Sequence, residues 1–353
     1  MASVLVTGAA GTVGNYVIGL AEAAGHRVVA SDLHPKGITM PVRGEVRPGD
    51  LRDRGFLEKL VRGVDYVIHT AAMLDVGAPT TVLSEVNTDA VVALYDAAAR
   101  AGAKHFVHVS TAMIYAEGQG VLNEHSKIAP RGPHGDTKYQ GEVGLRECAR
   151  RELPFTVLRA APLYGRRGRH YTASLLVVGP VLRLMSPWLP RWNGGPKANF
   201  VHAEDVARAL VFVLGRKDCE GEIFNVADED RLTLGERLTE TYRAYGLPTL
   251  PTGGLPRALL DRLGQFFQAE LPYRALDNAL LAAWKLVVLK HGLKPALRAR
   301  LDREALTLLY DDLAIDSGKL RALGWNPRFP SFRVGWQQVL RWYQAERWVP
   351  RYG

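Results

Sequence analysis

The sequence has little cysteine and no long hydrophobic run. Its only two cysteines, Cys148 and Cys219, lie far apart and belong to no ligand motif, which excludes a disulfide framework and a thiolate zinc site. No metal site is predicted. The most apolar stretch, residues 279–289, is interrupted by Lys285 and is too short to span a bilayer. Because the N-terminus also lacks the basic stretch and apolar run of a signal peptide, we expect a cytoplasmic protein.

Positive charge exceeds negative charge, but the excess is unevenly distributed. The formal net charge is +9, and between residues 257 and 303 nine basic residues accompany four acidic ones. No basic run alternates with aromatic residues as single-strand binding requires, so we expect no nucleic-acid partner. With Trp284 and these basic neighbours, residues 279–289 suit weak peripheral contact with a membrane; the alternative is a core or lid helix over a substrate pocket.

The first half of the chain alternates short apolar runs with amphipathic helical patterns. Such alternation predicts parallel strands joined by crossover helices, and continuous apolar strands are typical of a sheet covered on both faces. The predicted fold class is therefore α/β. We expect strands at 3–7, 26–31, 65–70, 104–110 and 155–159, and helices at 13–24, 54–61, 82–101 and 137–151.

A glycine recurs at every third position where the first strand enters the first helix, in the segment TGAAGTVG at 7–14. Gly8 permits the tight turn, Gly11 allows close approach to a pyrophosphate, and Gly14 lets the helix pack on the strand. The helix N-terminus, including Thr12 and Val13, supplies amide donors and a positive dipole. The motif predicts a dinucleotide site; a glycine turn without a ligand is the alternative.

The end of the second strand indicates which dinucleotide is preferred. Asp32 follows Gly8 by 24 positions, where a carboxylate accepts hydrogen bonds from an adenosine ribose and repels a 2′-phosphate. NAD(H) is therefore favoured over NADP(H), although Lys36 and Arg43 nearby weaken the preference. These features predict a Rossmann doubly wound parallel sheet with a smaller, mostly helical C-terminal substrate lobe. We expect residues 1–165 to form the NAD(P)-binding domain, its sheet completed by parts of 199–245, and residues 166–198 and 246–353 to form the substrate lobe or lid.

The spacing TGxxGxxG resembles the extended short-chain dehydrogenase/reductase family, and further matches follow in the family's order. The resemblance is nearest to 3β-hydroxysteroid dehydrogenase-like, ketoreductase-like and epimerase-like members, and it implies a homodimer. For the cofactor, it also implies that Asp50 and Leu51 flank adenine and that Thr70, Ala71 and Ala72 lie beneath the dinucleotide. It places Asn87 on the asparagine-bearing helix and Pro162 in the nicotinamide-side loop at 159–165. It further implies that Thr111 is the catalytic Ser/Thr.

One position departs from the family pattern. The family places a catalytic tyrosine four residues before a lysine on a helix, and here the lysine is Lys138 whereas the tyrosine position holds His134. Three interpretations stay open. His134 is itself the proton donor; or a displaced group such as Tyr115, Tyr139, Thr111 or water replaces it; or the protein binds NAD(H) without turnover.

The predicted reaction is hydride transfer between the nicotinamide and a carbonyl or secondary alcohol of a hydrophobic, sterol-like or polyketide-like substrate. Lys138 would hold the cofactor ribose. The apolar stretches at 175–189 and 279–289 favour such a substrate over the polar one of a nucleotide-sugar epimerase or dehydratase, which is the first alternative; a non-catalytic redox sensor is the second. A basic cluster of Arg166, Arg167, Arg169 and His170 suits an anionic substrate group or is a solvated loop.

Overall fold

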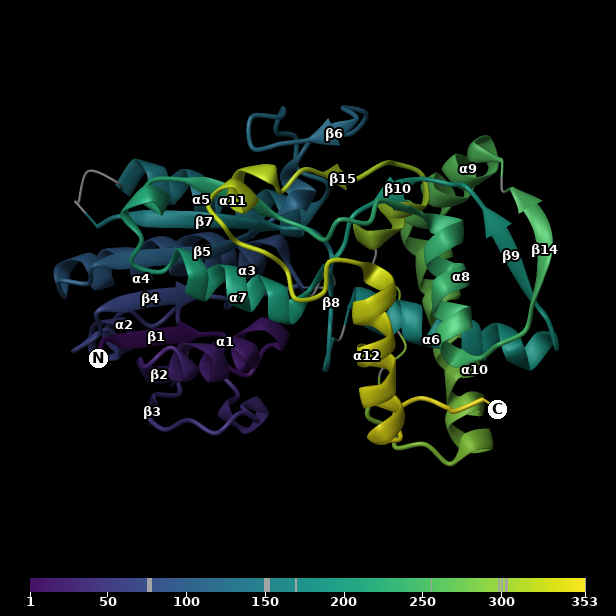
Figure 1. The fold of residues 1–353 in the computed structure, drawn as a ribbon, viewed down its shortest axis with the longest axis horizontal. Helices are drawn as coiled ribbons and strands as arrows, with labels where there is room; N and C mark the ends of the chain where they lie inside the picture. Colours follow the sequence, from purple (N-terminus) through teal and green to yellow (C-terminus); the bar gives the residue numbers. More distant parts are fainter. Residues whose placement is uncertain are drawn as a thin grey trace.

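A parallel sheet of seven strands forms the core of one half of the molecule (Figure 1). The computed structural model describes residues 1–74, 78–148, 153–168, 170–254, 256–297, 299, 301 and 304–352. The strand order is β12-β7-β5-β4-β1-β2-β3, which is the doubly wound arrangement predicted from the sequence. The strands are β1 (Ser3–Thr7), β2 (Arg27–Ser31), β3 (Glu45–Val46), β4 (Tyr66–His69), β5 (His105–Thr111), β7 (Phe155–Ala160) and β12 (Ile223–Val226).

The carboxyl ends of the strands meet at one edge of the sheet. Thr7 pairs with Ser31 on one side and with His69 on the other, and Thr111 pairs with Ala160. The central strands are almost completely buried, which explains their continuous apolar sequences. Residues that follow these strands are therefore gathered along the edge where a Rossmann sheet binds its ligand.

Helices cover both faces of the sheet. On one face α1 (Thr12–Ala23) packs against α7 (Ala203–Val213). On the other face α4 (Ala90–Arg100) packs against α2 (Arg54–Leu60) and α5 (Pro133–Cys148). Each face has its own apolar core, since the buried residues of α1 and α7 fall in one cluster and those of α2 and α4 in another.

Three local predictions were wrong in their boundaries. The helix expected at 137–151 begins at Pro133, because proline fits the first helical position, where its missing N–H is not needed. The helix expected at 82–101 is divided into α3 (Thr80–Ser84), a π-helical turn at Glu85–Asp89 and α4. Residues 49–51, which the family resemblance places at the end of the third strand, follow that strand as a loop, because it ends at Val46.

The second half of the molecule is mostly helical. It contains α6 (Tyr171–Met185), α8 (Leu234–Tyr245), α9 (Arg257–Gln268), α10 (Glu270–His291) and α12 (Phe332–Ala345), with β9 (Leu189–Asn193) paired to β14 (Thr249–Gly254) on its outer side (Figure 1). The shorter elements are η1 (Pro35–Gly37), η3 (Ala112–Ile114), β6 (Val121–Leu122), β8 (Leu163–Tyr164), β10 (Lys197–Ala198), β11 (Val201–His202), η5 (Lys217–Cys219), β13 (Leu232–Thr233), η6 (Glu304–Leu309), β15 (Ala314–Ile315) and α11 (Gly318–Ala322).

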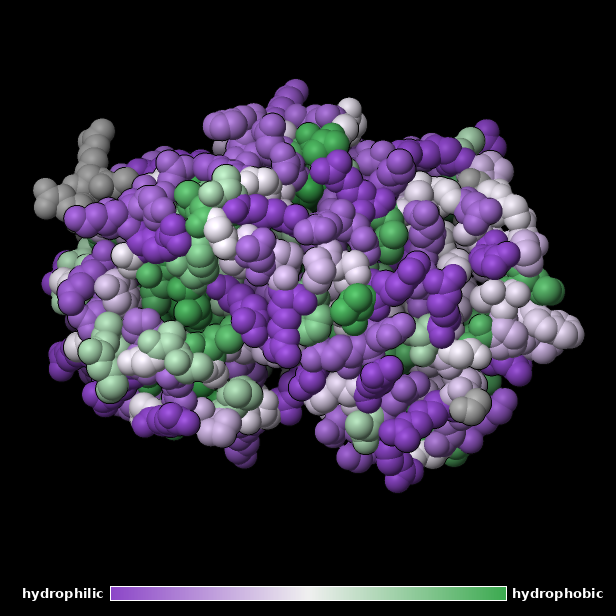
Figure 2. Space-filling view, viewed as in Figure 1, coloured by the Kyte–Doolittle hydropathy of each residue, from purple (hydrophilic) through white to green (hydrophobic). Residues whose placement is uncertain are grey.

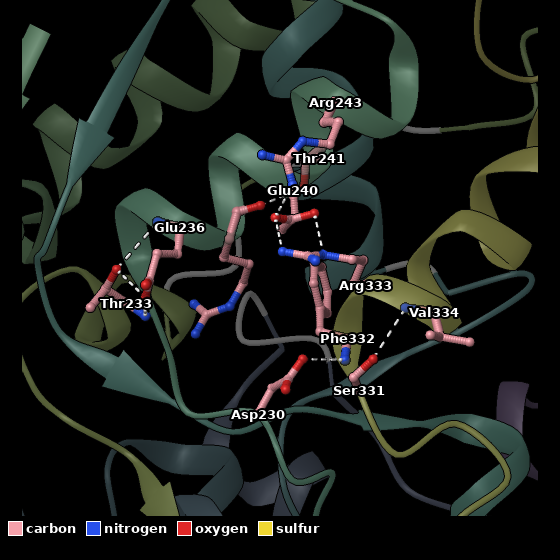
Figure 3. A network of polar contacts seen from close by, with 11 residues as sticks. Asp230, Thr233, Glu236, Glu240, Thr241, Arg243, Ser331, Phe332, Arg333 and Val334 are labelled. Atoms are coloured by element: carbon pink, nitrogen blue, oxygen red, sulfur yellow. Dashed lines mark hydrogen bonds and ion pairs between the residues drawn. The ribbon is translucent and has the colours of Figure 1, made fainter. Parts of the chain in front are cut away.

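A polar network fastens α12 to α8 (Figure 3). The Glu240 carboxylate of α8 accepts hydrogen bonds from the Arg333 guanidinium at 2.8 and 3.0 Å. The Asp230 carboxylate accepts one from the Phe332 amide at 3.0 Å, and Thr233 caps α8. The C-terminal helix is thereby fixed on the lobe, beside the junction with the sheet.

The surface seen in the view of Figure 1 is mostly hydrophilic, with apolar side chains gathered mainly over the sheet-based half (Figure 2). Within the described ranges, no helix is both long and apolar enough to cross a bilayer. Nor do the described residues place three or more His, Cys, Asp or Glu side chains where they could hold a metal ion.

Candidate active site

The glycine loop packs so tightly that two of its glycines have no room for a side chain. Gly8 has a φ of 66°, and a Cβ atom there would lie 2.6 Å from the Ala71 amide nitrogen. A Cβ atom on Gly14 would overlap the Gly8 carbonyl oxygen. Both positions therefore need glycine for steric reasons, and the loop directly contacts the segment that follows β4.

The N-terminus of α1 is open at Gly11. A Cβ atom there would meet only the Gly8 carbonyl oxygen, at 3.0 Å. No side chain caps α1, so its first-turn amides, including those of Thr12 and Val13, are not occupied by a side-chain acceptor. An open backbone surface at an uncapped helix N-terminus fits the diphosphate of a dinucleotide.

Asp32 lies directly beside the glycine loop. Its carboxylate accepts hydrogen bonds from the Ala10 amide at 3.0 Å and from the amide two residues further on at 2.8 Å. A carboxylate offers more lone pairs than these two bonds use, so it can also accept from ribose hydroxyls. Arg43, whose charge weakened the predicted preference for NAD(H), forms an ion pair with Glu22, with 3.9 Å between Nε and Oε2.

The residues predicted beneath the cofactor follow β4 directly. Thr70 donates from Oγ1 to the Thr7 carbonyl oxygen at 2.7 Å, which ties the end of β4 to the end of β1. Ala71 and Ala72 continue from it and are half-buried. Thr70 and Ala71 therefore lie against the glycine loop.

The remaining predicted cofactor residues lie on two loops. Asp50 forms an ion pair with Arg52 at 2.6 Å, and this hydrogen bond lowers the pKa of Asp50. Leu51 beside it is half-buried. Pro162 follows β7 and accepts a hydrogen bond from the Val201 amide at 3.1 Å through its carbonyl oxygen.

Sequence reasoning missed Asn15, which fastens the segment after β2 to α1. Its Nδ2 donates to the Gly37 carbonyl oxygen at 3.3 Å, and its Oδ1 accepts from the amides of Thr39 and Met40 at 2.8 and 3.3 Å. Asn15 is only 7% exposed. Its position between apolar residues of the first helix was the available signal, because buried asparagine needs partners.

Arg167 also joins α1 to the segment after β2, through hydrogen bonds to Thr12 and Gly37. Its carbonyl oxygen accepts from Thr12 Oγ1 at 3.4 Å, and its guanidinium donates to the Gly37 carbonyl oxygen at 3.1 Å. Arg167 has a φ of 63°, a left-handed conformation that favours glycine and that concentrates at functional sites when other residues adopt it. The loop after β8 therefore reaches the glycine loop.

The start of α5, which carries His134, packs against the turn that follows β5. Thr111 ends β5, and its Oγ1 accepts a hydrogen bond from the Met113 amide at 3.2 Å. A Cβ atom on Gly135 would lie 2.8 Å from the Met113 carbonyl oxygen. Because Gly135 follows His134, the start of α5 rests on the turn that begins at Thr111.

His134 is 8% exposed, and its tautomer follows from its partner. Nδ1 lies 3.3 Å from the Met73 carbonyl oxygen, which can only accept, so Nδ1 carries the proton and Nε2 carries the lone pair. Burial, and to a smaller extent the charge of Lys138, lowers the pKa of His134 to about 3. At neutral pH the imidazole is therefore uncharged, with its proton on Nδ1 and none on Nε2.

Asn87 holds the carbonyl group to which His134 binds. Its Oδ1 accepts from the Met73 amide at 2.8 Å, while its Nδ2 donates to the Met73 carbonyl oxygen at 2.9 Å. The same Nδ2 also lies 3.1 Å from Thr137 Oγ1. The π-helical turn, α5 and the segment after β4 are thus joined around His134, as expected where π-turns occur at functional sites.

Lys138 lies one turn after His134 and is 3% exposed. Within the part of the chain that the structure describes, no carboxylate lies within 4 Å of its ammonium group; Glu142, four positions further along the helix, pairs with Arg159 at 2.7 Å. Burial lowers the pKa of Lys138 to about 7. A buried cation without an ion pair is costly, and such groups mark sites that bind or react.

Two histidines lie beneath Lys138 and add no charge to it. His69 and His108 stack at 5.4 Å between ring centroids, and both are fully buried. Burial lowers both pKa values, that of His69 to about 3. Neutral imidazoles leave Lys138 as the one group of this cluster that titrates near neutral pH.

Tyr115 does not serve as a displaced proton donor, because a buried network uses its hydroxyl. The hydroxyl donates to Asn225 Oδ1 at 2.6 Å and accepts from Arg159 Nη1 at 3.0 Å. Its side chain is fully buried. Tyr139, the other predicted substitute, follows Lys138 directly and points about 100° away from it around the helix axis.

We expect Tyr115→Phe to lower the free energy of unfolding by about 1–3 kcal/mol, because Asn225 and Arg159 would each lose a buried hydrogen-bond partner. The turnover number should not change. Denaturant unfolding and steady-state rates of the same preparations measure both effects. A fall in turnover with unchanged stability would assign the phenol to catalysis.

The predicted basic cluster does not converge on one point. Arg166 lines a groove of about 560 Å³ beside α12, together with Arg341. Arg167 turns to the glycine loop instead, as described above. His170 is the N-cap residue of α6, and Arg169 lies outside the described residues.

Comparisons with known proteins show which family and which relatives the chain is similar to. The family described as the NAD dependent epimerase/dehydratase family matches residues 4–227, which include the glycine loop, Asp32, Thr111 and Lys138. YtcB of Bacillus subtilis, an uncharacterized UDP-glucose epimerase, is 26% identical over 249 residues, which are 65% of this chain and 78% of YtcB. A 3-diazoavenalumate denitrifying reductase of a Streptomyces species is 28% identical over 346 residues, which are 94% of this chain and 98% of the reductase.

Solved structures share the fold over the full length. DesIV of Streptomyces venezuelae, a dTDP-glucose 4,6-dehydratase with bound NAD, has a TM-score of 0.70 at 22% identity and covers 98% of each chain. At this identity the similarity concerns the fold alone, and it confirms the predicted α/β architecture.

Proposed function

Because the chain belongs to the NAD dependent epimerase/dehydratase family, we propose that it transfers hydride between NAD and a carbonyl or secondary alcohol carbon of a mainly hydrophobic substrate. The dependence of the family on NAD confirms the cofactor predicted from Asp32. The observation that carries the proposal is Lys138, a buried cation without an ion-pair partner among the described residues, placed at the edge of the sheet where the glycine loop opens. The Streptomyces relative that covers nearly the whole chain is itself a reductase, which supports a net redox reaction.

Each residue of the site has a distinct part in this proposal. The first-turn amides of α1 hold the diphosphate, and Asp32 accepts from the adenosine ribose. Lys138 donates to the hydroxyls of the nicotinamide ribose, and Thr111 orients the substrate oxygen. When bound, NAD supplies the ring carbon that accepts or donates hydride.

His134 is not the proton donor in this proposal. Its Nδ1 proton is donated to the Met73 carbonyl oxygen, so Nε2 carries a lone pair and no proton. A neutral imidazole of this tautomer cannot deliver a proton from Nε2. The proposal therefore differs from the first interpretation of the sequence, in which His134 donates the proton.

We expect His134→Phe to lower kcat/KM by less than about tenfold, whereas removal of a general acid costs about 10²- to 10⁴-fold. The wild type should show an inflection near pH 7 from Lys138, and His134→Phe should keep it, since the imidazole stays neutral from pH 5 to pH 9 at a pKa of about 3. His134→Gln, which keeps a side-chain donor for the Met73 carbonyl oxygen, should retain more activity than His134→Phe. A loss of 10²-fold or more in both variants, together with loss of the inflection, would restore the imidazole as the acid.

A nucleotide-sugar epimerase or dehydratase is the second candidate. Its support is that YtcB and DesIV are named as enzymes of nucleotide sugars. Against it stand the apolar stretches at 175–189 and 279–289, which favour a hydrophobic substrate; most of the first stretch forms α6.

A substrate screen distinguishes the candidates. The purified protein is given NADH or NADPH with a library of hydrophobic carbonyl compounds, NAD with the corresponding alcohols, and separately UDP-glucose. We expect turnover with NAD(H) on a hydrophobic member of the library. Conversion of UDP-glucose without net change in NAD would favour the second candidate, and NAD binding without turnover of any compound would favour the redox sensor.

A further inference from the structure

An apolar stripe runs along the exposed face of α10. Leu271, Leu286 and Leu289 are 80%, 59% and 80% exposed. Three exposed alanines lie between them at helical spacing, so the stripe extends over about five turns, a length of about 27 Å. The α10 stripe comprises Leu271, Ala275, Ala279, Ala282, Leu286 and Leu289.

The opposite face of α10 packs against the protein core. Trp284 and Val287 are 2% and 0% exposed, and Trp284 Nε1 donates to the Leu297 carbonyl oxygen at 3.0 Å. A helix packed on one face normally presents polar residues to water on the other. Because α10 is apolar on both faces, its exposed face has the character of a binding surface.

The helix before α10 adds to the exposed apolar surface of this lobe. On α9, Leu259, Leu263 and Phe266 are 44%, 40% and 58% exposed and recur at intervals of four and three residues. α9 packs against α10. Two neighbouring helices thus each leave an apolar face uncovered.

Positive charge accompanies the α10 stripe. Arg274, Lys285 and Lys290 are exposed on the same helix. Arg274 pairs with Glu270, whereas Lys285 and Lys290 form no ion pair with a carboxylate of the described residues. The surplus of five positive charges between residues 257 and 303 complements a negative surface, and it would repel a second copy of the same stripe.

We propose that α10 docks, lying in the plane of the interface, on a membrane surface of anionic phospholipid, with the α10 stripe in the acyl boundary and Lys285 and Lys290 among the headgroups. Apolar residues on one face of a helix with flanking lysines are what such interfacial binding requires. This proposal is independent of the reaction at the active site.

Flotation with vesicles tests the proposal. The full chain is mixed with vesicles of phosphatidylcholine alone or with phosphatidylglycerol added, at low and high salt. We expect flotation with the anionic vesicles only, and weaker flotation at high salt. The double variant Leu286→Gln/Leu289→Gln should lower the floated fraction at least tenfold, and Lys285→Glu/Lys290→Glu should abolish the preference for anionic lipid.

Val121→Gln is the matched control, because Val121 is 49% exposed on β6 and lies outside the helical lobe. It should float like the wild type. All exchanged side chains are exposed, so circular dichroism melting should be unchanged in each variant. The proposal is overturned if the wild type stays at the bottom with anionic vesicles, or if sedimentation velocity shows a dimer that Leu286→Gln/Leu289→Gln dissociates, since the stripe would then bind a second copy.

Discussion

Lys138→Met is expected to lower kcat by about 10²-fold and, at the same time, to make the protein more stable. The loss of activity follows because, among the described residues, our proposal assigns the cofactor ribose to this ammonium group, and without it the nicotinamide would be misplaced. The gain in stability follows because a buried charge without an ion-pair partner is replaced by an apolar chain of similar length. Replacement of buried charges by apolar groups stabilises other proteins by about 1–4 kcal/mol.

The stability gained by Lys138→Met should decrease as the pH rises. Burial lowers the pKa of Lys138 from 10.5 to about 7 in the folded protein. Between these values the unfolded chain binds more protons than the folded one, so the stability of the wild type rises as the pH rises from about 7 to about 10.5. The difference between Lys138→Met and the wild type should therefore be largest below pH 7 and disappear toward pH 10.5.

Denaturant unfolding of the cofactor-free protein at pH 6 and pH 9, together with turnover at saturating substrate, measures both effects. Lys59→Met is the matched control, because Lys59 is exposed on α2, and it should change neither quantity. A variant of Lys138 that is less stable than the wild type, or that retains a tenth of the activity, would contradict the role given to this residue.

Gly11→Ala is expected to weaken NAD binding by about 10- to 100-fold without loss of stability. The added methyl group would meet only the Gly8 carbonyl oxygen, at 3.0 Å, and Gly11 has a φ of −71°, which alanine adopts readily. The methyl group would, however, stand where a diphosphate approaches the first-turn amides. Loss of hydrogen bonds to a charged group costs about 1.5–3 kcal/mol, and 1.4 kcal/mol is a tenfold change in affinity.

Calorimetry with NAD and thermal unfolding of the same preparations test this expectation. Gly14→Ala should lower stability as well as affinity, because its Cβ atom would overlap the Gly8 carbonyl oxygen. Gly55→Ala, in the first turn of α2, provides a control with a nearby side chain but no ligand site. Unchanged affinity in Gly11→Ala would remove the glycine loop from the cofactor site.

The fold and the cofactor half of the site could be predicted because their signals are local. β1 was placed at Ser3–Thr7 by its apolar run alone, and the glycine loop identified the start of α1. The start of α5 was misplaced because Gly132 and Pro133 resemble a turn in the sequence. In the structure Pro133 is the first helical residue, and Gly135 lies so close to the Met113 carbonyl oxygen that a Cβ atom there would be 2.8 Å from it.

The catalytic half depended on contacts between distant segments. His134 was found from its spacing to Lys138, but its tautomer is set by the Met73 carbonyl oxygen, 61 positions away in the sequence. The sequence suggested Tyr115 as a proton donor, but in the structure its hydroxyl donates to Asn225, 110 positions away. No window of sequence contains both partners of such a bond, so their roles could not be predicted from pattern.

The bridge that Arg167 makes from Thr12 to Gly37 has a kinetic consequence. Under our proposal the diphosphate and the adenosine of NAD lie along these two segments, so the two hydrogen bonds of Arg167 would help to hold the segments in place around the dinucleotide. An enzyme that returns the hydride to its own substrate keeps the dinucleotide, and tight binding costs it nothing. A reductase must exchange the spent dinucleotide in every cycle, so in a reductase the same two hydrogen bonds would bear on turnover as well as on affinity.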